Sequence, residues 1–416
     1  MKALRHWNRR GRPALMAIAV WLIASNAAAQ GAIGSGPLTG TLADVEPTSG
    51  VLRIGPLRVA PGLTIREIGI DDNVFDEAVD PKNDFVVAGT PDLSVFTRLR
   101  FVQISAYAGS EMQYYRTYES ERAIGHSFKG RIDLIASRLS PFIGAGQVRN
   151  RTRPNGEIDV RADAKNNELS GGLAYEVSAN ARVFAAVVET DVDYQDAFQD
   201  DVSLEQSLSH TGTEYMGGLK TALTPLLAMQ VRGGVRKDKF RFDPTRNGES
   251  RSGTVVLTFD RAAVISGLAQ FGYQDYVPED PLVAKYRGLT ASVGLTYPLL
   301  EIGHFNFAYQ RGIDYSFDVQ EGYYVNNSLS LAYTQRLFGE VDLQVQGTRA
   351  AFDYGHREGS QARQDTLDSV NGNLGYNLRN RSRVSVNYEL TERQSPAITA
   401  RNYVRRRIFL SWLVAF

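Results

Sequence analysis

The 416-residue chain has no cysteine and only five histidines. The absence of cysteine excludes a disulfide scaffold, a thiolate zinc site and a cysteine nucleophile. Five histidines leave little for a histidine metal cluster, and we expect neither a metal nor a cofactor. Beyond residue 24 there is no run of 18 apolar residues, so no membrane-spanning helix is expected there. The chain is therefore either soluble or crosses a membrane as strands.

The first 29 residues have the features of a secretory signal peptide. Residues 1–12 carry five basic side chains and no acid, residues 13–24 are almost wholly apolar, and small residues including Ala27 and Ala29 follow. A basic start, a short apolar stretch and an A-x-A site are typical of a signal peptide. The apolar stretch is well short of the ~20 residues that span a bilayer as a helix. We predict export, with cleavage after Ala29.

The rest of the chain divides into a lead-in and a long repetitive region. Residues 30–56 are rich in Gly, Pro, Ser and Thr, which predicts a flexible periplasmic segment. From residue 57 to 416, stretches of alternating polar and apolar residues are separated by breaks that are short and long in turn. Short turns at one end and long polar loops at the other are typical of an outer-membrane barrel. We predict an all-β fold, a transmembrane antiparallel up-and-down β-barrel of about 18 strands, with 16 possible.

The alternation can be followed by parity. The run VSVNYEL at residues 384–390 places Val, Val, Tyr and Leu on one face and Ser, Asn and Glu on the other. In residues 305–317 the odd positions read Phe, Phe, Tyr, Arg, Ile, Tyr and Phe. Side chains alternate between faces in any strand, so a soluble sandwich would share this pattern. The strands are long enough to cross a membrane, and Tyr and Phe gather toward their ends, which favours the barrel.

The C-terminal strand carries an apolar stripe. Its even positions include Ile408, Leu410, Trp412 and Phe416, and the chain ends at Phe416. This ending resembles the C-terminal signal read by the barrel assembly machinery of the outer membrane. We therefore assign Leu410, Trp412 and Phe416 as an assembly signal. The predicted location is the outer membrane of a Gram-negative bacterium, with membrane lipid, lipopolysaccharide and the assembly machinery as partners.

Three short motifs suggest a family. Residues 61–63 and 91–93 both read P-x-L, and residues 71–75 read DDNVF. These features resemble the β-barrel porin-2 type, and they cover the first quarter of the chain. The resemblance implies an outer-membrane pore of the kind found with exopolysaccharide biosynthesis and export genes. Polysaccharide and periplasmic export proteins would then be additional partners.

Charged residues on the polar parity of the strands are expected to line the pore. An Arg facing lipid at mid-depth would cost ~2–4 kcal/mol, so these side chains are assigned to the lumen. The predicted pore-lining residues are Arg131, Asp133, Arg232, Arg236, Asp314, Arg383, Glu389, Arg405 and Arg407. No catalytic constellation and no basic face for nucleic acid occurs, so neither an enzyme nor a nucleic-acid partner is expected.

Three functions remain open at this point. The first is a pore for exopolysaccharide export or secretion, the second a general diffusion porin for small solutes, and the third a structural or adhesive barrel. A large third loop folded into the lumen would favour the general porin. The longest loops are only about fifteen residues long, so the sequence does not indicate such a constriction. Whether the N-terminal segment plugs the lumen also stays open.

Overall fold

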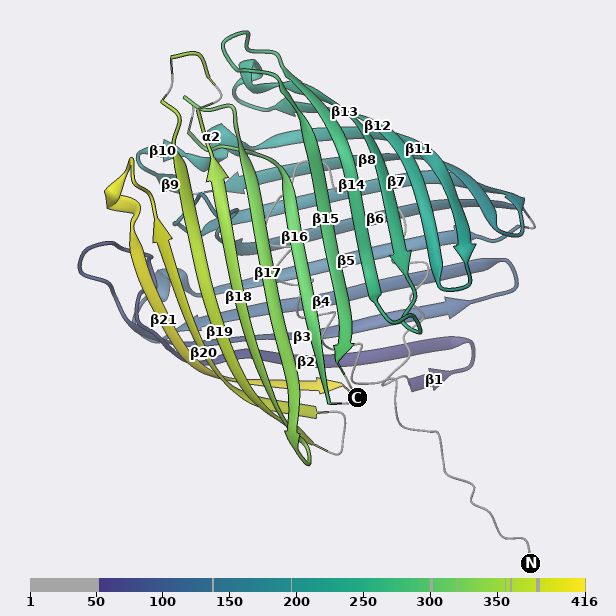
Figure 1. The fold of residues 1–416 in the computed structure, drawn as a ribbon, viewed down its shortest axis with the longest axis horizontal. Helices are drawn as coiled ribbons and strands as arrows, with labels where there is room; N and C mark the ends of the chain where they lie inside the picture. Colours follow the sequence, from purple (N-terminus) through teal and green to yellow (C-terminus); the bar gives the residue numbers. More distant parts are fainter. Residues whose placement is uncertain are drawn as a thin grey trace, which may run out of the picture.

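The computed structural model describes residues 52–136, 138–195, 197–299, 302–318, 320–355, 357–359, 361–378 and 382–415. In these residues 18 long antiparallel strands form one closed barrel (Figure 1). The first of them, β2, pairs with the last, β21, and this pairing closes the ring. The predicted fold class is confirmed, with 18 strands rather than 16.

The strands follow one another around the ring in chain order. Their bounds are β2 (Leu57–Asp71), β3 (Asp84–Arg98), β4 (Val102–Tyr115), β5 (Ala123–Leu134), β6 (Leu139–Thr152), β7 (Ala162–Ser178), β8 (Ala181–Gln195), β11 (His210–Thr224), β12 (Leu227–Phe240), β13 (Gly248–Phe259), β14 (Ser266–Pro278), β15 (Tyr286–Leu299), β16 (Gly303–Tyr315), β17 (Tyr323–Phe338), β18 (Val341–Asp353), β19 (Gln364–Leu378), β20 (Ser382–Gln394) and β21 (Tyr403–Ala415). The up-and-down order explains the alternation of turns and loops in the sequence.

A few short elements accompany the barrel. Strand β1 (Leu52–Ile54) pairs with the start of β2, so the end of the predicted lead-in extends the sheet, whereas residues 30–51 lie outside the described part. The loop between β8 and β11 holds β9 (Phe198–Gln199), β10 (Val202–Ser203) and helix α2 (Leu204–Leu208). Single 3-10 turns form η1 (Glu119–Glu121), η2 (Pro244–Arg246) and η3 (Thr399–Arg401). Among the described residues, no helix is long and apolar enough to cross a membrane.

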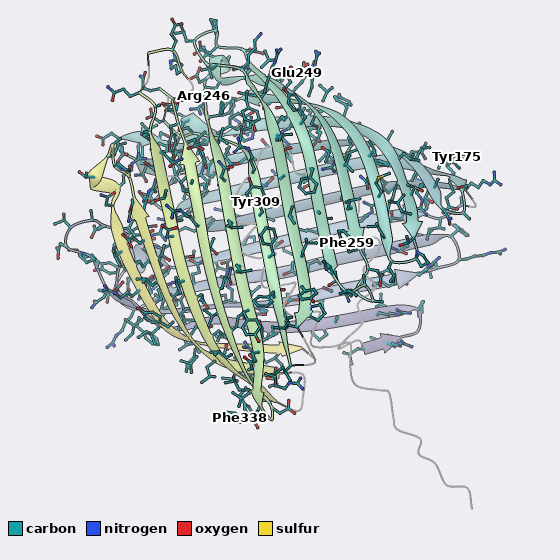
Figure 2. All side chains as sticks on the ribbon, viewed as in Figure 1. Tyr175, Arg246, Glu249, Phe259, Tyr309 and Phe338 are labelled. Atoms are coloured by element: carbon teal, nitrogen blue, oxygen red, sulfur yellow. The ribbon has the colours of Figure 1, made fainter. Side chains whose placement is uncertain are left out.

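The two ends of the barrel differ. Short connections such as residues 99–101 lie at one rim, which we call the short-turn rim. Longer connections such as residues 196–209 lie at the other, the long-loop rim. Figure 2 shows Tyr175, Phe259 and Phe338 toward the short-turn rim and Arg246 with Glu249 toward the long-loop rim. Tyr175 and Phe338 are exposed, which suits the interfacial position that Tyr and Phe prefer in barrels.

The wall is apolar outside and polar inside. On β20, Val386 and Tyr388 are exposed, whereas Ser385 and Asn387, which alternate with them, are buried. The outer face thus presents apolar side chains, as a lipid environment requires, and the hydrogen-bonding side chains of the alternate positions face the lumen. The parity seen in the sequence therefore follows the two faces of one sheet.

One hairpin departs from this parity. On β16 the odd positions form one apolar face in the sequence, yet Ile313 and Tyr315 are buried while Phe307 is exposed. The ladder between β15 and β16 stops at the pair Ala291 and Arg311, but β16 and β17 stay paired up to the tip of their hairpin. The tip therefore bends into the barrel, where the Tyr315 ring lies 4.8 Å from that of Phe240 on β12. Ile313 and Tyr315 therefore pack against the inner wall instead of lying on the outer face.

Candidate pore constriction and lumen

The third long connection, residues 153–161 between β6 and β7, folds into the lumen; we call it loop 3. Its Gly156 lies against Phe352 of β18, and a Cβ on this glycine would be only 2.4 Å from Phe352 Cζ. In the ring, β18 is nine strands on from β7, on the opposite side of the barrel. Loop 3 therefore crosses the lumen, and only glycine permits so close an approach at this position.

Glu157 anchors the tip of loop 3 to the loop between β16 and β17. Its carboxylate accepts hydrogen bonds from Ser316 Oγ at 2.7 Å and from the Phe317 backbone N–H at 3.1 Å. The Arg363 guanidinium lies 3.8 Å away. The side chain is fully buried, and burial raises the pKa of the Glu157 carboxyl to about 7, although both hydrogen bonds oppose the rise. The protonated and ionised forms of Glu157 are thus close in free energy near neutral pH.

Arg393, on the inner face of β20, holds the next part of loop 3. It donates to Asp159 at 2.7 Å, to Asp365 at 3.0 Å and to the Glu157 carbonyl at 3.2 Å. The Arg393 side chain is only 1% exposed, so these charges are shielded from solvent. Breaking one side of a buried ion pair leaves an uncompensated charge, which is strongly destabilising. The contacts of Arg393 therefore fix loop 3 in its crossing position.

The base of loop 3 binds to the first long connection, residues 72–83. Arg153 forms an ion pair with Asp76 at 2.9 Å, and its guanidinium also donates to the Val74 carbonyl. Arg161 donates to the same carbonyl and pairs with Glu121. The loop is thus fixed at both its base and its tip, and it narrows the long-loop end of the lumen.

Sequence reasoning did not identify loop 3 as a constriction. Charge-dense loop residues such as Glu157 and Asp159 usually indicate a solvated loop, and their arginine partners lie more than 200 positions away. A weak local signal exists, because Ile158 and Val160 alternate with the two acids as they would in a packed segment. Ile158 is indeed part of the aromatic and aliphatic cluster that fills this end of the barrel.

Each predicted pore-lining charge has a partner nearby. Arg131 donates to Asp133 at 2.8 Å on β5, and Arg236 pairs with Asp238 at 2.9 Å on β12. The other contacts are Arg232 to Gln270 at 3.3 Å, Asn326 to Asp314 at 3.2 Å, Arg383 to Asp342, Arg407 to Glu389 at 2.7 Å and to Glu67 at 3.3 Å, and Arg405 to Asp71. Most of these charges are thus compensated within the wall.

The structure brings only part of that set together. Glu389, Arg405 and Arg407 lie on the adjacent strands β20 and β21, where they meet Asp71 and Glu67 of β2. The remaining residues lie on β5, β12, β16 and β20, spread around the ring. They do not form one compact site.

Two large parts of the inner face differ in chemistry, and β20, β21 and β2, which lie between them on the closing side of the ring, carry the paired charges described above. On β13–β19 the inner positions between the rims carry uncharged hydrogen-bonding side chains; we call this surface the neutral wall. It comprises Ser252, Thr254, Gln270, Gln274, Thr290, Ser292, Thr296, Asn306, Gln310, Ser328, Ser330, Thr334, Gln344, Gln346, Thr348, Ser369, Asn371 and Asn373. Acids and arginines occur on the inner face of these strands only near the rims, as Asp314, Asp365, Arg336 and Asp342.

The inner face of β4–β12 contrasts with it, and we call that surface the charged wall. Its charged residues are Glu111, Lys129, Arg131, Asp133, Glu168, Glu176, Arg182, Glu214, Lys220, Arg232, Arg236 and Asp238. Acids and bases are equal in number in this set. Sequence parity identified some of these charges, but not their segregation to one side, which requires knowing which strands face each other.

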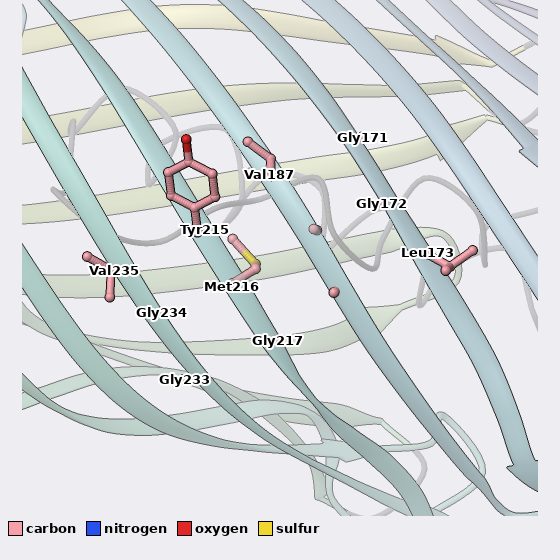
Figure 3. A pocket seen from close by; sticks show the side chains of 12 residues that line it. Gly171, Gly172, Leu173, Val187, Tyr215, Met216, Gly217, Gly233, Gly234 and Val235 are labelled. Atoms are coloured by element: carbon pink, nitrogen blue, oxygen red, sulfur yellow. The ribbon is translucent and has the colours of Figure 1, made fainter.

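The outer face bears a shallow groove on β7, β8, β11 and β12 (Figure 3). Gly171, Gly217 and Gly233 line it, and the exposed side chains of Val187 and Tyr215 flank it. Its lining is mostly apolar, so it offers no site for a polar solute. Within the described ranges, no group of three or more acidic or histidine side chains is placed to hold a metal ion.

Two of the predicted assembly residues, Leu410 and Trp412, lie in the second half of β21, toward the short-turn rim. Leu410 and Trp412 are both exposed on the outer face, and Trp412 Nε1 donates to Ser382 Oγ at 2.6 Å. Phe416, and the predicted cleavage residues Ala27 and Ala29, lie outside the described residues.

Residues 48–416 match the family described as "Putative beta-barrel porin 2", so the chain belongs to this family. The predicted resemblance is thereby confirmed. Among curated proteins, none matches the chain.

Solved structures share the architecture at low sequence identity. Pseudomonas aeruginosa OccK2 (OpdF), in complex with glucuronate, has a TM-score of 0.50 at 11% identity, covering 86% of this chain and 98% of that one. Pseudomonas aeruginosa OpdO has a TM-score of 0.49 at 14% identity, covering 86% and 97%. Acinetobacter baumannii OccAB3 has a TM-score of 0.47 at 10% identity, covering 86% and 99%. At such identities the likeness concerns the fold alone.

Proposed function

We propose that this protein is an outer-membrane porin of a Gram-negative bacterium through which small solutes diffuse. The observation that carries the proposal is loop 3, which crosses the lumen of an 18-stranded ring and is fixed to the opposite wall by Glu157 and Arg393. Rings of 16–18 strands are too wide for side chains alone to fill, so an inserted loop can narrow the channel without closing it. A channel, not an enzyme, is the function that fits the family and the fold.

The two alternative functions, exopolysaccharide export and adhesion, have less support than diffusion of small solutes. Exopolysaccharide export, which the resemblance implied, has no support from the comparisons, and a diffusion porin fits them better. A loop fixed across the mouth by buried ion pairs also suits small solutes better than a continuous polymer. An adhesive barrel would not need the polar inner face that β13–β19 present.

Conductance in planar bilayers tests the proposal. The purified chain should insert and give ohmic current steps in symmetric potassium chloride, because water fills the polar lumen. Migration that changes on boiling before electrophoresis would verify that the inserted protein is a folded barrel. Folded protein that inserts but never conducts would contradict the proposal and bring the adhesive barrel forward.

A further inference from the structure

The neutral wall offers many hydrogen-bonding side chains without charge, with small or apolar residues such as Val256, Ala332 and Ala350 between them. Amides and hydroxyls both donate and accept, and each can exchange a bond to water for a bond to a solute. Several of these side chains are linked: Gln346 donates to Ser330 at 2.9 Å, and Thr348 donates to Ser330 at 3.0 Å. All three are partly exposed, so they reach the solvent of the lumen.

Not every side chain of the neutral wall reaches the solvent of the lumen, and Asn306 on β16 is buried. The Asn306 side-chain carbonyl accepts from Thr296 at 2.8 Å, but its Nδ2 group is buried and has no hydrogen-bond partner in the structure. The Asn306 Nδ2 group is shielded from solvent, so the hydrogen bonds that this surface offers to a solute come from partly exposed side chains such as Ser330 and Gln346.

The charged wall on the other side of the lumen exerts little net attraction on ions. Arg131 and Arg236 each pair with an aspartate two residues further on, on the same strand. Acids and bases are balanced in number along this wall, so their fields largely cancel at the centre of the lumen. An ion that moves along the neutral wall would give up water without meeting a countercharge, which is unfavourable.

We propose that this pore passes uncharged polyhydroxylated solutes, such as small sugars, in preference to charged solutes of the same size, with the neutral wall as the surface along which they move. The inference rests on the proposed porin function and adds its substrate class. A neutral sugar exchanges hydrogen bonds with water for bonds with the neutral wall at nearly constant energy along the path. An acid or amine of equal size does not have this compensation.

Swelling of proteoliposomes that contain the full chain tests the substrate class. Glucose, gluconate and glucosamine are the probes, because they are similar in size and differ in charge. Glucose should enter several-fold faster than both charged probes. Equal rates, or faster entry of gluconate, would overturn the inference.

Substitutions in the neutral wall test whether this surface causes the preference for glucose. The triple change Ser330→Ala, Gln346→Leu and Asn371→Leu should lower glucose entry several-fold while potassium chloride conductance persists. Ser170→Ala, an inner position on β7 of the opposite side, is the matched control and should leave glucose entry unchanged. If the triple variant admits glucose at the unchanged rate, the neutral wall is not the path.

A second variant covers the case in which the triple variant does not fold. Gln346→Glu keeps the shape of the side chain and adds one negative charge to the neutral wall. It should raise glucosamine entry relative to glucose, and unchanged ratios would overturn the inference. The porin proposal is tested separately, because a barrel that conducts without preferring glucose contradicts only the substrate class, whereas a barrel without conductance contradicts both.

Discussion

At the scale of single residues, the DDNVF motif has a structural reason. Asp72 continues the pairing of β2 with β21: its backbone N–H donates to the Arg406 carbonyl, and its side chain accepts from the Arg406 N–H. The buried Asn73 side chain donates to the carbonyls of Glu77 and Val404. The Val74 carbonyl accepts from the arginines at the base of loop 3. The motif therefore joins the first long loop both to the closing strand and to the constriction.

Glu157 gives the constriction a dependence on pH. Its pKa is raised from 4.5 to about 7 by burial, so the in-folded loop holds the proton more tightly than a loop exposed to water. Below pH 4.5 both arrangements are protonated and there is no penalty. Between pH 4.5 and 7, Glu157 ionises in the exposed arrangement but stays protonated in the in-folded one. The stability of the in-folded arrangement relative to the exposed one therefore falls by on the order of 3 kcal/mol over this range and is constant above pH 7.

We therefore expect the anchoring of loop 3 to weaken as the pH rises from 4.5 to 7. Single-channel recordings should show a mean conductance that increases over this range and then levels off. Glu157→Gln removes the titration and should give a much flatter profile. Glu249→Gln is the control, because Glu249 lies on the outer face of β13, and it should keep the profile of the unchanged protein. An unaltered profile in Glu157→Gln would contradict the role of this carboxyl.

At the scale of elements, the seam between β2 and β21 closes the barrel with ion pairs as well as backbone bonds. Arg405 binds Asp71 and lies 3.4 Å from Asp76. Arg407 lies between Glu389 on β20 and Glu67 on β2. These two arginines, predicted only as lumen charges, therefore also hold the seam. The partners of these two arginines could not be predicted from the sequence, because they depend on the register of the first strand against the last.

The two arginines should have separable effects. Arg407→Gln leaves Glu389 and Glu67 without a cation, so reversal potentials under a salt gradient should shift toward cation selectivity. Arg405→Gln leaves Asp71 and Asp76 with one cationic partner fewer. It should mainly lower the temperature at which the folded form is lost on unboiled gels, because breaking a buried ion pair costs several kcal/mol of stability. Identical effects on selectivity and on thermal stability in both variants would contradict this division.

The end of β21 remains a prediction about assembly. Deletion of Phe416 should lower the yield of folded protein in the outer membrane while the signal peptide is still removed, because the terminal aromatic is the expected recognition element. The fraction of heat-modifiable protein in outer-membrane preparations measures this. Deletion of the exposed Val79, in the first long loop, is a control of equal length. Equal folded yields in both deletions would rule out Phe416 as an assembly signal.

At the scale of the whole molecule, the sequence predicted the barrel but not which segments fold into its lumen or how charge is distributed on its inner face. Strand parity and loop alternation depend on near neighbours in the chain, so the sequence predicted the fold class and about 18 strands, with 16 left open. The crossing of loop 3, the inward bend at Ile313 and the contrast between the neutral wall and the charged wall depend on contacts such as Glu157 with Ser316, 159 residues apart. The local alternation around Ile158 indicates a packed segment, but no local pattern identifies the distant partners in these contacts.

The position of loop 3 across the ring leads to a prediction about the size of the channel. Thr152 and Ala162 are paired at the ends of β6 and β7, so a short turn can join these strands in place of the loop. Replacing residues 154–160 with a Gly-Ser turn should raise single-channel conductance several-fold, because the lumen of an 18-stranded ring would then be limited by its walls. Thermal stability should fall, since Arg393 loses Asp159 but keeps Asp365.

The matched control replaces the exposed residues 78–80 of the first long loop with Gly-Ser-Gly, which should leave the conductance unchanged. Both variants must first show the folded, heat-modifiable form, so that a change in current reports on the channel and not on unfolding. If the shortened barrel is folded and conducts as the unchanged protein does, loop 3 does not set the width of the pore. The constriction would then have to lie at the β16–β17 tip, where Ile313 and Tyr315 turn into the barrel.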